Sequence, residues 1–113
     1  MRASDCPRWS TRYVVAESAH AALCVPRAHA IFAGHFPGMP LVPGVMLLEW
    51  ALHEAARALA IEPRELRIRE SKFLAPLRPD ERAELFLTIS SPRASFRICR
   101  GTELLASGVL DRT

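Results

Sequence analysis

Apolar and polar positions follow two different periods along this chain. From residue 45 onward, apolar residues recur at positions 45, 48, 52, 56 and 59, which is the spacing of one helix face. Pro43 suits the first turn of a helix, and Pro63 ends the pattern. The sequence therefore predicts one helix over residues 43–60, with Glu54 and Arg57 marking its polar face.

Period-two patterns typical of β-strands lie on both sides of this helix. Two β-favouring segments precede it, at 11–15 and 21–25, and alternating positions follow Pro63. Turn residues at 78–81, at 91–92 and at Gly101 divide this second part into strands at 66–74, 83–90, 95–100 and 104–110. The pattern indicates a single α+β domain over residues 1–113, in which a curved antiparallel sheet of about six strands wraps one long central helix.

The segment 26–43 holds too many Pro and Gly residues for regular structure. Long ordered loops in small domains are disproportionately functional, so His35 within this segment is a candidate for chemistry. The three other histidines are interpreted as ordinary exposed or hydrogen-bonded residues. They are His20, His29 and His53.

A carboxylate interrupts the apolar run of the predicted helix. Glu49 comes four residues after Val45 and three before Leu52, so we expect it on the inward apolar face. A buried carboxylic acid is costly to ionise and is therefore suited to donate a proton. The alternative is a buried Glu that bonds backbone groups and serves packing alone.

A possible base and an oxyanion site accompany this acid. His35 lies in the stiff loop, and Pro43-Gly44 begins the helix, where unpaired N–H groups and the helix dipole favour an oxygen that gains negative charge. The combination suits abstraction of a proton next to a carbonyl, with protonation of a departing group. A metal site is not indicated, because no second ligand accompanies His35 at a recognisable spacing.

The residues 34–49, GHFPGMPLVPGVMLLE, resemble the signature of the hotdog-fold 3-hydroxyacyl acyl-carrier-protein dehydratases. In that family a His-Phe-Pro-Gly segment precedes Pro-Gly and then Glu or Asp. The residues 72–85, KFLAPLRPDERAEL, resemble its strand-turn-strand, so the resemblance runs from about residue 10 to the end. Trp50 follows the acid where the fatty-acid enzymes usually have Ala, which is more similar to the dehydratase-like proteins of aryl-polyene pigment pathways.

The resemblance implies a hotdog fold that assembles as a homodimer or a larger oligomer such as a hexamer, with each active site shared between subunits. His35 would take the C2 proton, Glu49 of the other subunit would protonate the leaving hydroxyl, and the Gly44 N–H would hold the thioester oxygen. No metal or soluble cofactor is implied, because the acyl group is carried on the phosphopantetheine arm of acyl carrier protein. The substrate tunnel would be lined by Phe36, Pro43, Val45 and Trp50.

The chain has a formal net charge of +3, and five basic residues are clustered in its second half. These residues form either a solvated face or a docking surface for an acidic partner, for which acyl carrier protein is the candidate. Nucleic acid is a poor candidate, because exposed aromatics are not interleaved with the basic residues. The basic residues are Arg64, Arg67, Arg69, Lys72 and Arg78.

No signal peptide or membrane-spanning stretch is recognisable, so a cytoplasmic location is expected.

The sequence therefore predicts dehydration of a 3-hydroxyacyl thioester, bound to acyl carrier protein, to the trans-2-enoyl thioester in fatty-acid or aryl-polyene biosynthesis. Two alternatives stay open. A hotdog thioesterase would use a carboxylate to direct water at the thioester. An inactive acyl-binding or partner-binding subunit would keep the signature without turnover.

Overall fold

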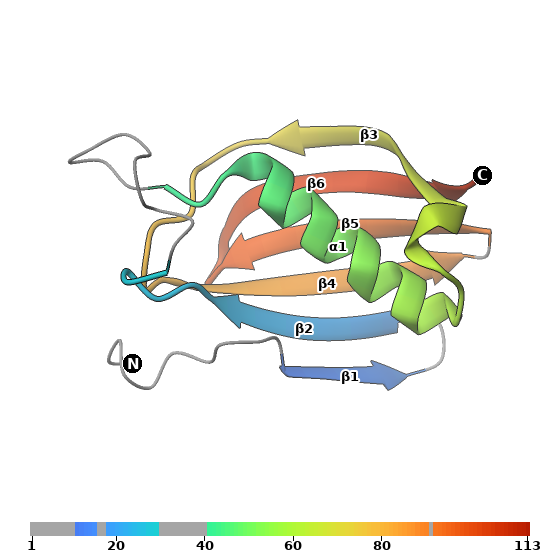
Figure 1. The fold of residues 1–113 in the computed structure, drawn as a ribbon, viewed down its shortest axis with the longest axis horizontal. Coiled ribbons are helices and arrows are strands. Elements are labelled where there is room, and N and C mark those ends of the chain that lie inside the picture. The colour runs from blue at the N-terminus through green and yellow to red at the C-terminus, as the bar shows by residue number, and fades with distance from the viewer. Residues whose placement is uncertain (1–10, 16–17, 30–40, 91) are drawn as a thin grey trace.

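The computed structural model describes residues 11–15, 18–29, 41–90 and 92–113, and of residues 11–15 only the backbone. Within these ranges one six-stranded sheet and one long helix make up the fold (Figure 1). The strands are β1 (Thr11–Val15), β2 (Ser18–Cys24), β3 (Leu66–Phe73), β4 (Arg82–Ser90), β5 (Arg93–Arg100) and β6 (Glu103–Arg112). The helix α1 spans Gly44–Leu59, and a short 3-10 helix, η3, spans Pro63–Glu65.

The strands lie in the order β1-β2-β4-β5-β6-β3, and each neighbouring pair is antiparallel. The helix crosses one face of this sheet, while β3 forms one edge beside the first turns of α1 (Figure 1). This arrangement confirms the predicted α+β hotdog fold and the predicted order of elements. The helix bounds agree within one residue, whereas β2 begins at Ser18 rather than at residue 21. No described helix has the length and apolar character that spanning a membrane would require.

The helix packs on the sheet through a stripe of small and apolar side chains. Leu47, Ala51 and Ala55 are buried, together with Phe96 and Ile98 of the facing sheet. Alanine side chains allow the helix axis to come close to the sheet, so the larger Ile and Phe side chains of the strands fill the space between the layers. The side of α1 that carries Leu47, Ala51 and Ala55, here called the alanine stripe, therefore faces the core.

The alanine stripe corrects the predicted orientation of the helix. Val45 is 65% exposed and Glu49 is exposed, so Glu49 does not lie on the inward face of the single chain. Glu54, which the sequence predicts on the polar face, is buried at 6% exposure. The helix has apolar residues on more than one side, and the side with the smallest side chains packs closest to the sheet.

A β-bulge interrupts the pairing of β3 with β6. Ile68 pairs with Leu110 and Glu70 pairs with Val109, which leaves Arg69 as the extra residue. Because side chains alternate along a strand, one extra residue exchanges the faces of all the residues that follow. Phe73, opposite the buried Ala106, therefore faces the helix.

Candidate active site

The N-terminus of α1 has no side-chain cap among the described residues. Its N-cap residue is Pro43, with φ −58°. The N–H groups of Met46 and Leu47 bond the Pro43 carbonyl oxygen at 3.0 and 3.4 Å. The first N–H of the helix, at Gly44, precedes these bonded groups at the positive end of the helix dipole. A carbonyl oxygen that gains negative charge would be stabilised here.

An apolar pocket of about 480 Å³ opens beside this helix end. The Val42 N–H donates to the Leu77 carbonyl oxygen at 2.8 Å, which ties the segment before α1 to the loop between β3 and β4. The volume lies within the range of about 300–1,000 Å³ that is usual for small-molecule sites. The pocket is lined by Leu41, Val42, Pro43, Gly44, Leu47, Phe73, Ala75, Pro76 and Leu77.

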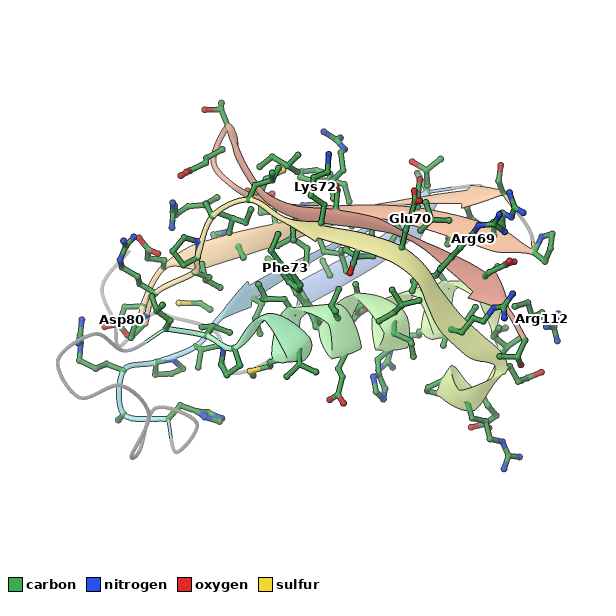
Figure 2. All side chains as sticks on the ribbon, turned by 90° about the horizontal axis from the view of Figure 1, so that it is seen from above. Arg69, Glu70, Lys72, Phe73, Asp80 and Arg112 are labelled. Atoms are coloured by element: carbon green, nitrogen blue, oxygen red, sulfur yellow. The ribbon has the colours of Figure 1, made fainter. Side chains whose placement is uncertain are left out.

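Phe73 covers Gly44 from the edge of the sheet. A Cβ atom added at Gly44 would lie 2.9 Å from Cε1 of the Phe73 ring. Figure 2 shows Phe73 pointing from β3 toward α1, whereas Lys72 points the opposite way. Sequence reasoning missed Phe73 as a site residue, although the Lys-Phe pair lies in the second segment of the family resemblance. A larger residue at position 44 would therefore push the Phe73 ring out of its present place.

The predicted catalytic pair is described only in part. His35 and its neighbour Phe36 lie outside the described residues, so their roles stay predictions. Glu49 is exposed on α1, and its carbonyl oxygen is 2.8 Å from Nδ1 of His53. The placement of base and acid relative to each other therefore stays a prediction.

The predicted tunnel residues differ in their placement. Pro43 lines the pocket, whereas Val45 and Trp50 are not among its lining residues. Trp50 packs against the core, and its Nε1 is buried without a hydrogen-bond acceptor among the described residues. The roles of Val45 and Trp50 in a tunnel completed by a second subunit stay predictions.

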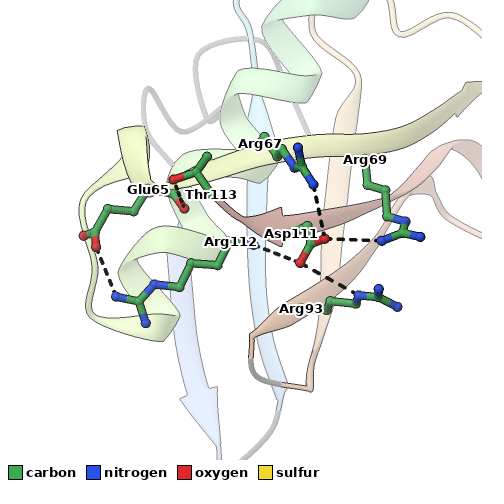
Figure 3. Close-up of polar contacts among 7 residues, drawn as sticks. All are labelled: Glu65, Arg67, Arg69, Arg93, Asp111, Arg112 and Thr113. Carbon is green, nitrogen blue, oxygen red and sulfur yellow. Dashed lines mark hydrogen bonds and ion pairs between the residues drawn. The ribbon is translucent and has the colours of Figure 1, made fainter.

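Arginines from β3 and β5 surround one carboxylate of β6, beside the first half of β3 and away from the pocket. The Asp111 carboxylate lies 3.8 Å from Arg67, 3.3 Å from Arg69 and 3.8 Å from Arg93 (Figure 3). The Asp111 side chain is only 13% exposed, while the three arginines extend into solvent. Three guanidinium groups around one carboxylate leave this arginine cluster positive.

The arginine cluster includes only part of the predicted docking surface. Arg93 joins it from β5, and sequence reasoning missed this residue because strand pairing alone brings it beside β3. Arg78 lies in the loop after β3, close to Asp80, and Figure 2 places Asp80 and Arg69 at opposite ends of the molecule. Lys72 is on β3 between these ends, and Arg64 is in η3. The five predicted basic residues are thus spread from η3 along β3 to the loop that follows it.

The family model described as ApeI dehydratase, of the ApeI-like family, matches residues 12–109. The chain belongs to this family. The resemblance to hotdog dehydratases is thereby confirmed, and the ApeI-like branch is the one that matches. This chain is similar to the structure of the dehydratase heterocomplex ApeI:P from Xenorhabdus doucetiae. The TM-score is 0.75 at 25% sequence identity, and the match covers 90% of this chain and 93% of that chain.

Curated relatives of the ApeI-like chain include the 3-hydroxyacyl acyl-carrier-protein dehydratase FabZ of two bacteria. The chain is 34% identical over 94 residues to that of Novosphingobium aromaticivorans, which is 74% of this chain and 58% of the relative. It is 37% identical over 71 residues to that of Mannheimia succiniciproducens, covering 55% and 47% respectively. The chain thus spans about half the length of the curated relatives it matches.

The fold itself is shared more widely than the family. Thioesterase superfamily member 2 of Mus musculus matches with a TM-score of 0.70 at 17% identity, covering 91% of this chain and 80% of that one. This similarity shows the fold alone. The fold by itself therefore does not distinguish a dehydratase from a thioesterase.

Proposed function

We propose that this chain dehydrates a 3-hydroxyacyl thioester carried on acyl carrier protein to the trans-2-enoyl thioester. The observation that carries the proposal is the uncapped N-terminus of α1, at Gly44, which adjoins an apolar pocket in a chain of the ApeI-like family. The pocket suits an acyl chain, and the helix end suits the thioester oxygen. Biosynthesis of fatty acids or of aryl polyenes is the proposed pathway class.

In the proposed reaction His35 removes the C2 proton, and the electrons of that C–H bond move toward the thioester carbonyl. The Gly44 N–H stabilises the oxygen that gains negative charge. The electrons then form the C2–C3 double bond as the C3–O bond breaks, and Glu49 protonates the departing hydroxyl, which leaves as water. The balance of atoms needs no metal and no soluble cofactor.

We infer that each site combines residues of two subunits, which explains why Glu49 is exposed in the single chain. β3 forms an edge of the sheet, and exposed apolar side chains lie on it and on the adjacent first turn of α1. Such an edge can pair with a second copy, which would cover these side chains. They are Val45, at 65% exposure, Ile68, at 36%, and Phe73, at 50%. The proposed assembly is a homodimer or a larger oligomer such as a hexamer, and pairing with a related chain is the alternative that the ApeI:P structure suggests.

Acyl carrier protein is the proposed partner, and the arginine cluster is its proposed docking surface. Antiparallel pairing of two β3 strands would place the start of one strand beside the end of the other. The Arg67 and Arg69 of one subunit would then approach the Phe73 end of its partner. An acidic carrier bound to the cluster could in this way deliver its arm to the pocket of the neighbouring subunit.

The direct test uses Glu49→Gln and His35→Ala. Glu49→Gln keeps the shape of the side chain and removes the proton donor, so the turnover number should fall about 10²–10⁴-fold. Enoyl absorbance measures the reaction, and release of free thiol would instead identify a thioesterase. A wild-type protein that yields neither signal would be an acyl-binding or partner-binding subunit. Glu49→Gln activity within a few-fold of wild type would remove Glu49 from the mechanism.

Mixed subunits test the shared site. In a dimer of one His35→Ala and one Glu49→Gln chain, a cross-subunit arrangement places both changes in one site and leaves the other intact. Refolding the two inactive variants at equal amounts should therefore restore about a quarter of wild-type activity, because half the dimers are mixed and each has one good site. No recovery would mean that His35 and Glu49 act within one subunit.

A further inference from the structure

We propose that Phe73 is a specificity-determining residue, whose ring limits the size of the acyl group held beside Gly44. The inference rests on the proposed function and extends it to the substrate class. A compact or short acyl group would be preferred, and removal of the ring would admit longer ones. Three observations support this role: the direction of the ring, its contact with Gly44 and its freedom from the core.

The direction of the ring depends on the bulge at Arg69. Regular alternation from the buried Leu66 would place residues 68, 70 and 72 on the helix side and Phe73 on the outer face. The extra residue reverses this order, so Ser71 and Phe73 face the helix. Bulges beside active sites often redirect one side chain in this way. The local fold thus brings an aromatic ring to the proposed thioester site.

The contact with Gly44 places the ring where an acyl group would begin. The ring carbons Cε1 and Cζ lie 2.9 and 3.0 Å from the position of a Cβ atom at Gly44. A thioester oxygen bound to the Gly44 N–H would therefore lie close to the ring. The acyl carbons next to this carbonyl would meet Phe73 before they reach the deeper pocket.

Three other large side chains of the pocket belong to the core. Val42, Leu47 and Leu77 are buried and pack in the main hydrophobic cluster, so they cannot move without disturbing the fold. Phe73 is 50% exposed and is absent from that cluster. Within the single chain, Phe73 can therefore be trimmed to enlarge the pocket beside Gly44 without opening a cavity in the hydrophobic core.

The test measures kcat/KM for soluble 3-hydroxyacyl pantetheine thioesters of increasing acyl length. In Phe73→Ala the ratio of long-chain to short-chain kcat/KM should rise about tenfold or more, since one methylene in an apolar pocket is worth about 10–200-fold. Leu74→Ala is the matched control, because Leu74 is the next residue, is 54% exposed and is not among the lining residues of the pocket. Its ratio should stay within about twofold of wild type. Phe73→Leu should give an intermediate ratio.

A binding measurement separates this inference from the proposed function. Pantetheine amides of 3-hydroxy acids resist turnover, and their Kd values across acyl lengths can be measured by calorimetry for wild type and both Phe73 variants. Suppose that the wild-type protein binds the amides without dehydrating the thioesters, and that Phe73→Ala shifts the acyl-length preference of binding. This result would contradict the proposed function and leave the role of Phe73 standing. Folded Phe73→Ala and Phe73→Leu proteins with the wild-type preference in both assays would overturn the role of Phe73.

Discussion

Glu65 joins three segments of the chain at one corner of the sheet. Its carboxylate accepts a hydrogen bond from the Glu62 N–H at 2.8 Å. The carboxylate also accepts one from Arg112 at 3.0 Å, and the Glu65 carbonyl oxygen accepts one from the Thr113 N–H at 2.8 Å (Figure 3). The hydrogen bond from the Glu62 backbone, followed by the Arg112 contact, lowers the pKa of Glu65 below its ordinary value of 4.5. Glu65 thus caps the N-terminus of η3 and links η3 to the C-terminal end of β6.

The lowered pKa predicts an acid-dependent loss of stability. Because the unfolded chain binds a proton at Glu65 before the folded chain does, the stabilisation is complete above about pH 4.5 and is lost as pH falls through the lower folded pKa. Thermal melts between pH 7 and pH 3 should therefore show a smaller acid-induced decrease in Tm for Glu65→Gln than for wild type. Glu70→Gln, on the exposed strand β3, is the control and should follow wild type. Parallel curves for Glu65→Gln and wild type would contradict this role.

The edge strand β3 is held to β6 by a close approach at Gly108. A Cβ atom at this position would lie 2.5 Å from the Glu70 carbonyl oxygen and 2.6 Å from Cε1 of Phe96. Phe96 is buried beneath the helix, and the Glu70 carbonyl is backbone next to the bulge. Neither neighbour can move aside cheaply, so glycine at 108 allows the bulged strand to join the sheet.

Gly108→Ala should consequently destabilise the protein by about 1–3 kcal/mol, the usual cost of forcing an extra carbon into a packed core. Urea unfolding followed by circular dichroism measures the change. Ser107→Ala tests the adjacent residue of the same strand and should stay within about 0.5 kcal/mol of wild type. If both variants unfold at the same urea concentration as wild type, the contacts at Gly108 do not constrain β3.

Across the whole molecule, the arginine cluster and the pocket lie at opposite ends of β3. Carrier docking on the cluster predicts that turnover of a carrier-bound substrate falls as salt rises, chiefly through KM. The Debye length shrinks from about 10 Å at 0.1 M to about 3 Å at 1 M, which weakens the attraction. A soluble pantetheine thioester lacks the acidic partner and should respond much less.

Removal of two arginines tests the same surface without salt. Arg69→Ser with Arg93→Ser leaves Arg67 beside Asp111 and should raise KM for the carrier-bound substrate about three- to tenfold. Arg57→Ser with Arg82→Ser removes the same charge from exposed positions on α1 and β4, and should leave this KM near wild type. Equal effects of the two double variants, or equal salt sensitivity of both substrates, would identify the cluster as a solvated face.

The sequence by itself determined the order and approximate bounds of the elements. Pro43 and Pro63 bracket the helix, and Gly101 lies in the turn between β5 and β6, because these residues restrict or widen backbone conformation locally. The spacing from His35 to Glu49 and the Pro-Gly pair before the helix also indicated the dehydratase family. These features depend on neighbours in sequence, so no long-range contact was needed to recognise them.

Tertiary structure alone decided which faces those elements present. The helix has several apolar sides, and the close approach of Ala51 and Ala55 to the sheet turned Glu49 outward. The bulge at Arg69 turned Phe73 toward Gly44, and pairing through β6 brought Arg93 to Asp111. Register, bulges and helix rotation are set by packing between distant segments, where a one-residue shift exchanges the faces of a strand.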